Sequence, residues 1–263
     1  LTRYESSEVA PQEAARSRSS STSVWIALLL LAAAGWAVVA LQVRAMGQMP
    51  PGMDAMAPAP VTLLLFLPVW IAMMVAMMFL SVAPVVSLFA AAGRTRREAG
   101  GRATPVWVFV AGYLAVWSLF GLGAFLLSLA VPALGMAANG LRDVSALAGG
   151  AVLILAGLYQ WSPLKQVCLR HCRSPLGVLV HRWREGRAGA FRMGFAHGAY
   201  CVGCCWGLML VLFAVGLMNL VAMVALTGVI FAEKVVPHGP LIGKVAAGAL
   251  VLYGVLTIVM GAS

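Results

Sequence analysis

Long apolar stretches alternate with short polar segments along most of the chain. The apolar stretches cover about residues 24–43, 61–88, 105–131, 144–161, 191–215, 217–236 and 243–260. A helix rises about 1.5 Å per residue, so stretches of about 20 residues cross a hydrocarbon layer of ~30 Å. The pattern predicts an all-α fold: a polytopic transmembrane helix bundle of about seven spans in the lipid bilayer.

The polar segments divide the chain further. Residues 1–23 are rich in Ser and Arg and carry too little apolar surface to fold alone, so we expect a disordered cytoplasmic tail. Residues 24–43 are predicted to form an anchor helix, and residues 44–60 a Met-rich exterior loop. Residues 61–263 then form a six-helix membrane domain, in which the segment 162–190 could hold a short helix at the interface.

Composition and charge set the orientation of this bundle. The chain is 62% hydrophobic and 10% charged, with a net charge of +10. With the N terminus in the cytoplasm, all 18 basic residues except Arg44 and Arg142 lie in cytoplasmic segments, as the positive-inside rule requires. The positive charge therefore indicates how the helices are oriented in the membrane. The sequence has no basic face with interleaved aromatic residues, so we expect no nucleic-acid binding. The sequence also lacks nucleotide-binding and zinc-hydrolase motifs, which excludes a primary pump and disfavours a hydrolase.

The segment FAHGAYCVGCCWGLM places reactive side chains inside an apolar span. On a helix that turns about 100° per residue, four soft donors share an arc of about 80°. These four donors are Met193, His197, Cys201 and Cys204, and Cys205 lies close beside them. A single buried Cys or His is more often a core residue. Three thiols beside a histidine within a membrane span favour a metal or redox site instead.

Small residues favour close packing of the same span. Gly194 and Gly198 are four residues apart, as are Gly203 and Gly207. This spacing lets neighbouring helix backbones approach closely. We therefore expect the helix over residues 191–215 to be central to the bundle.

Methionines in the second apolar stretch are a candidate second half of the site. In PVWIAMMVAMM, Met73 and Met77 are four residues apart and share one helical face. The two helices are expected to run in opposite directions, and counting about 1.5 Å per residue places these methionines and the cysteines in the middle third of the bilayer. A methionine stripe alone is more often core packing, so packing stands as the alternative.

Two further groups of sulfur lie near the membrane surfaces. The exterior loop holds Met46, Met49, Met53 and Met56. Thioethers persist where free thiols would be oxidised, and they select Cu(I) over zinc, calcium or magnesium. On the cytoplasmic side, CLRHC carries Cys168 and Cys172, which share a face if the segment is helical. Contact with lipid or a partner is the alternative for the methionines, and plain packing for the two cysteines.

Four segments resemble a bacterial family of predicted metal-binding integral membrane proteins. They are PVWIAMMVAMM, YQWSPLKQVCLRHCRSP, GFAHGAYCVGCCWGLM and MNLVAMVALTGVIFAEK. The resemblance covers about residues 60–260, and its HGxYCxGCCWxLM core is specific because several rare residues recur at fixed spacing. It implies a membrane bundle in the bacterial inner (cytoplasmic) membrane, with a suspected metal site on His197, Cys201, Cys204 and Cys205. Copper is our own inference, from the softness of the donors.

These observations predict a Cu(I)-handling protein whose metal-binding part is residues 61–263. The exterior methionines would collect Cu(I), the mid-membrane donors would hold it, and the CLRHC cysteines would exchange it with the cytosol. This route serves transport or delivery to a copper enzyme or metallochaperone. One alternative is a membrane thiol-redox protein that uses the C-x-x-C pair of Cys201 and Cys204. Another is an accessory subunit of a larger membrane complex, and neither this role nor copper handling requires a catalytic residue.

Overall fold

The computed structural model describes residues 2–46, 59–135, 141–174, 183–216 and 219–261, and each regular element within these ranges is an α-helix. In chain order the helices are α1 (Thr2–Met46), α2 (Ala59–Glu98), α3 (Val106–Gly135), α4 (Leu141–Gln160), α5 (Pro163–Arg173), α7 (Gly186–Val215), α8 (Leu220–Val235) and α9 (Gly239–Gly261). The all-α fold class is thereby confirmed. The helix expected within residues 162–190 is α5.

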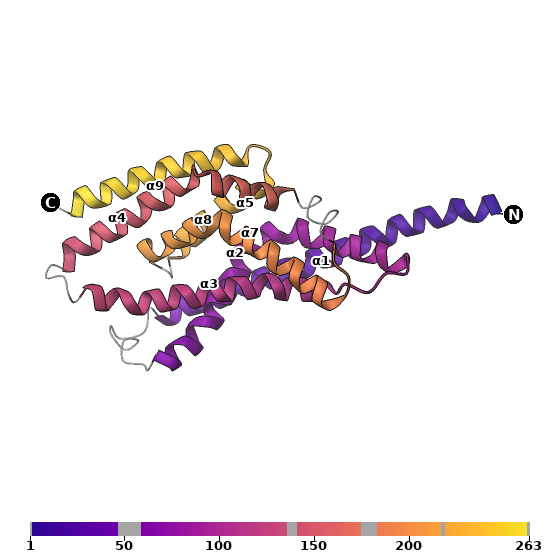
Figure 1. Ribbon diagram of the computed structural model, residues 1–263, viewed down its shortest axis with the longest axis horizontal. Helices are drawn as coiled ribbons and strands as arrows, with labels where there is room; N and C mark the ends of the chain where they lie inside the picture. The colour runs from indigo at the N-terminus through magenta and orange to yellow at the C-terminus, as the bar shows by residue number, and fades with distance from the viewer. Residues whose placement is uncertain (1, 47–58, 136–140, 175–182, 217–218, 262–263) are drawn as a thin grey trace.

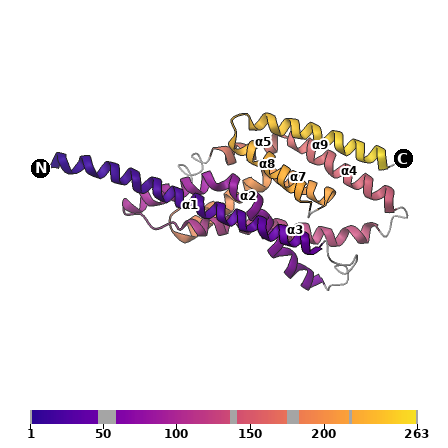
Figure 2. The same ribbon diagram turned by 180° about the vertical axis from the view of Figure 1, so that it is seen from behind.

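The long helices lie roughly antiparallel along one axis (Figures 1 and 2). In Figure 1, α1, α3, α7 and α9 run from the end that carries the N terminus toward the end that carries the C terminus, while α2, α4 and α8 run back. The main helix contacts pair α4 with α9, α1 with α2, and α3 with α7. α7 contacts α3, α4, α5 and α8, which confirms its expected central position.

Helix length and composition agree with a membrane protein. Among the described residues, five segments are long and apolar enough to cross a bilayer: Thr22–Ala45, Leu63–Glu98, Val106–Leu127, Gly186–Val215 and Gly239–Gly261. A sixth is added if α4 and α5, which meet at a bend of 62°, form one broken span. α8 has 16 residues, about 24 Å of helix, which is short of the ~30 Å hydrocarbon layer. The seven spans and the cytoplasmic N terminus therefore stay predictions.

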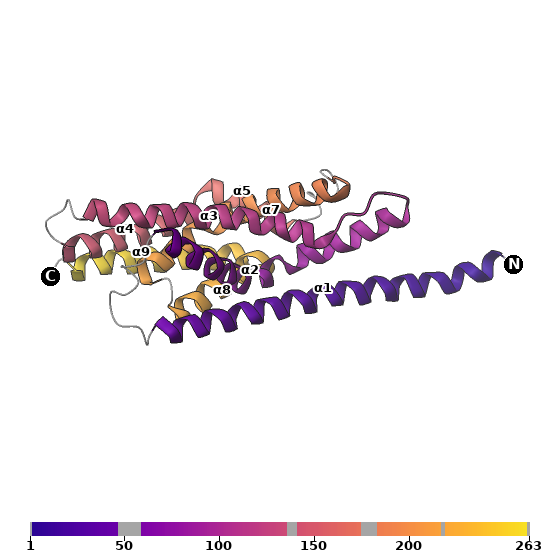
Figure 3. The same ribbon diagram turned by 90° about the horizontal axis from the view of Figure 1, so that it is seen from below.

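The N-terminal segment differs from our expectation. We expected residues 1–23 to be disordered, but α1 is helical from Thr2 and extends past the rest of the bundle (Figure 3). The costly step in forming a helix is the first turn, and the apolar span already supplies it. Extending that helix toward the N terminus adds one backbone hydrogen bond for each residue that is ordered. The tail also contains Ala, Glu, Gln and Arg, which have good helix propensity.

The breaks between helices follow from local sequence signals. α4 ends before Ser162, whose side chain accepts a hydrogen bond from the backbone N–H of Lys165 at 3.2 Å. Pro163 occupies the first turn of α5, where its missing N–H costs nothing. α8 begins in the same way after Asn219, whose side chain accepts from the backbone N–H of Ala222 at 3.1 Å. These caps separate α4 from α5 and start the two helices that flank the candidate site.

α3 and α7 approach each other closely at glycines. A Cβ added at Gly112 would lie 3.0 Å from the backbone nitrogen of Phe195 and closer still to the carbonyl oxygen of Phe191. On the opposite helix, a Cβ added at Gly194 would overlap the carbonyl oxygen of Phe109. Both positions therefore require glycine, and they set the distance between the two helices.

Trp70 of α2 ties this core together at one point. Its side chain is buried against aromatic rings of α2, α3 and α7, and its Nε1–H donates to the carbonyl oxygen of Trp117 at 3.0 Å. We expect Trp70→Phe to lower the free energy of unfolding by about 1 kcal/mol or more, because a hydrogen bond and buried ring area are lost. Thermal unfolding in detergent measures the change. Trp107→Phe is the matched control, since Trp107 is 51% exposed; equal losses for both variants would contradict the assignment.

Candidate metal centre

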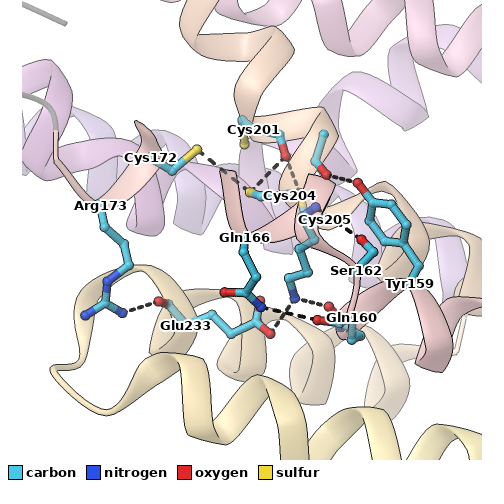
Figure 4. A network of polar contacts seen from close by, with 12 residues as sticks. Tyr159, Gln160, Ser162, Gln166, Cys172, Arg173, Cys201, Cys204, Cys205 and Glu233 are labelled. Carbon is cyan, nitrogen blue, oxygen red and sulfur yellow. Dashed lines mark hydrogen bonds and ion pairs between the residues drawn. The ribbon is translucent and has the colours of Figure 1, made fainter. Parts of the chain in front are cut away.

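Three thiols of α7 form a compact buried group. The Sγ atoms of Cys201, Cys204 and Cys205 all lie within 4.8 Å of one another, and each residue is 1% exposed. Spacings of three and four residues bring side chains onto one helix face. The thiols of Cys204 and Cys205 donate to the carbonyl oxygen of Cys201 at 3.1 and 2.9 Å. We call these three residues the thiol cluster; Figure 4 shows them together.

α5 brings a fourth thiol to the cluster. The Sγ atoms of Cys172 and Cys204 lie 3.8 Å apart (Figure 4). This distance is far longer than a disulfide bond of about 2.05 Å. It is shorter than two metal–sulfur bonds of about 2.3 Å placed end to end. The sulfurs are therefore close enough to share one ion, and the two cysteine motifs of the sequence meet in space.

Cys168 lies one helical turn before Cys172 on α5, outside the cluster. Its thiol is free and half-buried. It packs against Gly203 of α7, where an added Cβ would lie only 2.6 Å from its Sγ. Nearby, the ring of His171 stacks on the ring of Tyr200 with centroids 4.2 Å apart. α5 thus packs on α7 through the side chains of Cys168 and His171.

Polar groups from two other helices contact Cys201, and a third helix contributes a hydroxyl beside one of them. Lys234 of α8 donates from Nζ to Cys201 Sγ at 3.0 Å and to Ser81 Oγ of α2 at 3.4 Å. The hydroxyl of Tyr113, on α3, lies 3.1 Å from the same sulfur. Our sequence reasoning assigned none of these three residues to the site. The available signal was Lys234 itself, because a lysine in an apolar helix is unusual unless it has a partner or a role.

The remaining predicted donors on α7 have other surroundings. His197 is buried, and its ring lies 6.2 and 6.1 Å from the rings of Phe109 and Tyr113 on α3. Met193 is buried nearer the start of α7, where its Sδ accepts the backbone N–H of Arg184 at 3.3 Å. Both ligand roles stay predictions.

The predicted methionines divide into a core pair and a loop group. Met73 and Met77 are buried in the same hydrophobic core as the thiol cluster. Met46 is the last residue of α1, whereas Met49, Met53 and Met56 lie outside the described residues. The ligand roles of both groups stay predictions.

A buried ion pair fastens α5 to α8. Lys165 Nζ lies 2.6 Å from Glu233 Oε1, and the two side chains are 1% and 2% exposed. Lys165 also donates to the side-chain oxygen of Gln160. At the other end of α5, Arg173 donates to the carbonyl oxygen of Glu233 (Figure 4). Because Cys172 lies between these two anchors, they determine where the fourth thiol is held.

The chemistry of the donors suits a soft metal ion. Four thiols in an apolar interior, joined by a lysine and a tyrosine hydroxyl, resemble neither a calcium nor a magnesium site, which are built from oxygen ligands. Thiolates select Cu(I), zinc or iron–sulfur clusters. Cu(I) needs only two or three sulfur donors, and the thiol cluster alone supplies three.

Comparison with known proteins agrees with this chemistry. A family model described as PpoB2, copper chaperone, matches residues 67–257. Searches of curated proteins and of solved structures give no significant match. The matched range covers more than two thirds of the 263 residues and contains the thiol cluster, Cys172 and Lys234. This family is consistent with copper, the metal that we inferred from the softness of the donors, and the chain belongs to the PpoB2 copper chaperone family.

Proposed function

We propose that this protein is an integral membrane copper chaperone that binds Cu(I) at the thiol cluster and Cys172 and passes it to a copper enzyme. The proposed location is the bacterial inner membrane, with the N terminus in the cytoplasm. The observation that carries the proposal is the 3.8 Å approach of Cys172 to Cys204. It joins the CLRHC motif on α5 to the CVGCC motif on α7 in one buried sulfur site.

Delivery requires a route from the buried sulfurs to a partner, and α5 offers one. Cys168 is half-buried and Cys172 is buried one turn later, next to the cluster on α7. Cu(I) moves between sulfur donors by exchange between two- and three-coordinate states, in which an incoming thiolate binds before the outgoing one leaves. In the proposed path, Cys172 takes the ion from Cys204 and Cys168 presents it to a soluble metallochaperone or to the target enzyme.

The other predicted donors have auxiliary roles in this proposal. Met73, Met77 and His197 would complete the coordination of Cu(I) on the inner side of the cluster, with Met193 near the start of α7. The exterior methionines, Met46, Met49, Met53 and Met56, would collect the ion before it enters the bundle. Met73 and Met77 are buried in the same core as the thiol cluster, which supports this arrangement.

Copper binding by purified protein tests the proposal. Cu(I) affinity is measured without oxygen by competition with a chromogenic Cu(I) chelator. We expect Cys201→Ser and Cys204→Ser each to lower the affinity by more than the ~10- to 100-fold typical of a residue outside the ligand shell. Cys168→Ser is the matched control, because its thiol lies outside the cluster; it should retain the affinity and slow transfer to an acceptor.

Two results would contradict copper binding at the cluster. One is a copper stoichiometry that neither cysteine substitution changes. The other is a reversible two-electron oxidation of Cys201 and Cys204 in protein that binds no metal, which would favour the thiol-redox alternative. Counting free thiols in oxidised and reduced samples distinguishes this second result.

A further inference from the structure

The ammonium group of Lys234 lies directly on the thiol cluster. Its Nζ is 3.0 Å from Cys201 Sγ and 3.4 Å from Ser81 Oγ, and the side chain is partly buried. A charge withdrawn from water in a membrane protein is costly and commonly marks a functional position. Packing alone does not account for a lysine here, because an apolar side chain would fill the same space at lower cost.

The neighbouring carboxylate does not neutralise this charge. Glu233 precedes Lys234 on α8, but adjacent residues point about 100° apart around a helix. Glu233 therefore reaches α5, where Lys165 lies 2.6 Å away. Within the described ranges, Lys234 forms no ion pair with a carboxylate. Ser81, beside Lys234, and Tyr113, at Cys201, are neutral. Among the described groups at the cluster, only thiolates can therefore balance the positive charge of Lys234.

This fixed charge distinguishes metal ions by their own charge. Two thiolates, one Cu⁺ and one ammonium sum to zero, which is the charge that a low-dielectric interior tolerates best. Two thiolates, one Zn²⁺ and one ammonium leave one net positive charge. The ammonium also repels a divalent ion twice as strongly as a monovalent ion at the same distance. Zn²⁺ reaches neutrality with the three thiolates of the cluster, which is one ligand short of the four that a closed zinc site uses. With the four thiolates of a closed zinc site, the group would carry a net negative charge.

We propose that Lys234 is a specificity-determining residue that makes the thiol cluster select a soft monovalent cation over a divalent one. The inference rests on the proposed function, since it requires that the cluster binds a metal. Cu(I) and Ag(I) belong to the favoured class, and Zn(II) to the disfavoured class. Lys234 is not a ligand in this scheme; it acts through the charge that it places beside Cys201.

Affinities for Ag(I), Cu(I) and Zn(II), measured on the full chain in detergent without oxygen, test the inference. We expect Lys234→Met to lower the Cu(I) and Ag(I) affinities about 10- to 100-fold. The Zn(II) affinity should hold or rise, so the ratio of monovalent to divalent affinity falls at least about tenfold. Lys234→Arg should keep the ratio because it keeps the charge. Lys244→Met is the matched control, since Lys244 is an exposed lysine on α9 and its loss should leave the ratio unchanged.

A second variant tests the same charge without removing the lysine. Ser81→Asp places a carboxylate beside the Lys234 ammonium and should lower the affinity ratio as Lys234→Met does, whereas Ser81→Asn should not. An unchanged ratio in Lys234→Met or Ser81→Asp, in protein that loses Cu(I) on Cys204→Ser, would overturn the inference and leave the proposed function standing. Wild-type protein that binds neither Cu(I) nor Ag(I) would instead overturn the proposed function.

Discussion

Replacing Glu233 with glutamine is expected to lower the free energy of unfolding by about 3–5 kcal/mol. The carboxylate lies 2.6 Å from Lys165 Nζ, and both side chains are almost fully buried. The substitution leaves the Lys165 ammonium in the interior with only neutral amide oxygens as polar partners, that of Gln160 and that of the new side chain at position 233. An unpaired buried charge costs far more than a lost surface ion pair. Chemical unfolding in mixed micelles, followed by tryptophan fluorescence, measures the loss.

A double variant separates the orphaned charge from lost packing. Lys165→Met combined with Glu233→Leu removes both charges and keeps similar side-chain volumes. Replacing a buried ion pair by apolar residues is often neutral or stabilising, so the double variant should unfold close to wild type. A double variant as unstable as Glu233→Gln would show that packing, and not the unpaired ammonium, explains the loss.

The same ion pair has a consequence at the metal centre. Lys165 and Cys172 both belong to α5, and the pair with Glu233 holds that helix where Cys172 reaches Cys204. We therefore expect Glu233→Gln to weaken Cu(I) binding as well as the fold, whereas Cys168→Ser affects neither. Stability and ligand position are coupled here because one helix carries both the anchor and the thiol.

Features set within one helix could be predicted from the sequence. The meeting of Cys201, Cys204 and Cys205 follows from their spacing alone, because the angle between helical residues does not depend on the rest of the fold. The helix pattern also followed from the apolar stretches, since the length of a span is tied to the thickness of the hydrocarbon layer. These expectations needed no knowledge of which helices are neighbours.

Features set between helices could not be predicted in the same way. Lys234 and Tyr113 reach Cys201 from α8 and α3, and nothing in their local sequence states which helix they face. The placement of Cys172 depends on the 62° bend between α4 and α5, whose direction is set by tertiary contacts. Composition has a different limit at the N-terminal segment: it measures whether a segment can fold alone, whereas residues 2–23 continue the helix of the first apolar stretch.

The largest packing effect is expected at Gly194 of α7. We expect Gly194→Leu to lower the free energy of unfolding by at least about 3 kcal/mol, at or beyond the upper end of typical overpacking. The obstacle is backbone, since even a Cβ would overlap the carbonyl oxygen of Phe109 on α3. A main-chain atom cannot rotate away as a side chain can, so the two helices must separate. Thermal unfolding in detergent, measured beside wild type, gives the shift.

Gly123→Leu is the matched control for this substitution. Gly123 lies on α3 with no atom within 4 Å of an added Cβ, so the same change should cost little and gains helix propensity. Separation of α3 from α7 would also withdraw the Tyr113 hydroxyl, now 3.1 Å from Cys201 Sγ, so Gly194→Leu should weaken Cu(I) binding where Gly123→Leu does not. Equal unfolding midpoints for the two variants would mean that α3 does not approach α7 at Gly194, and the contact of Tyr113 with the thiol cluster would lose its structural basis.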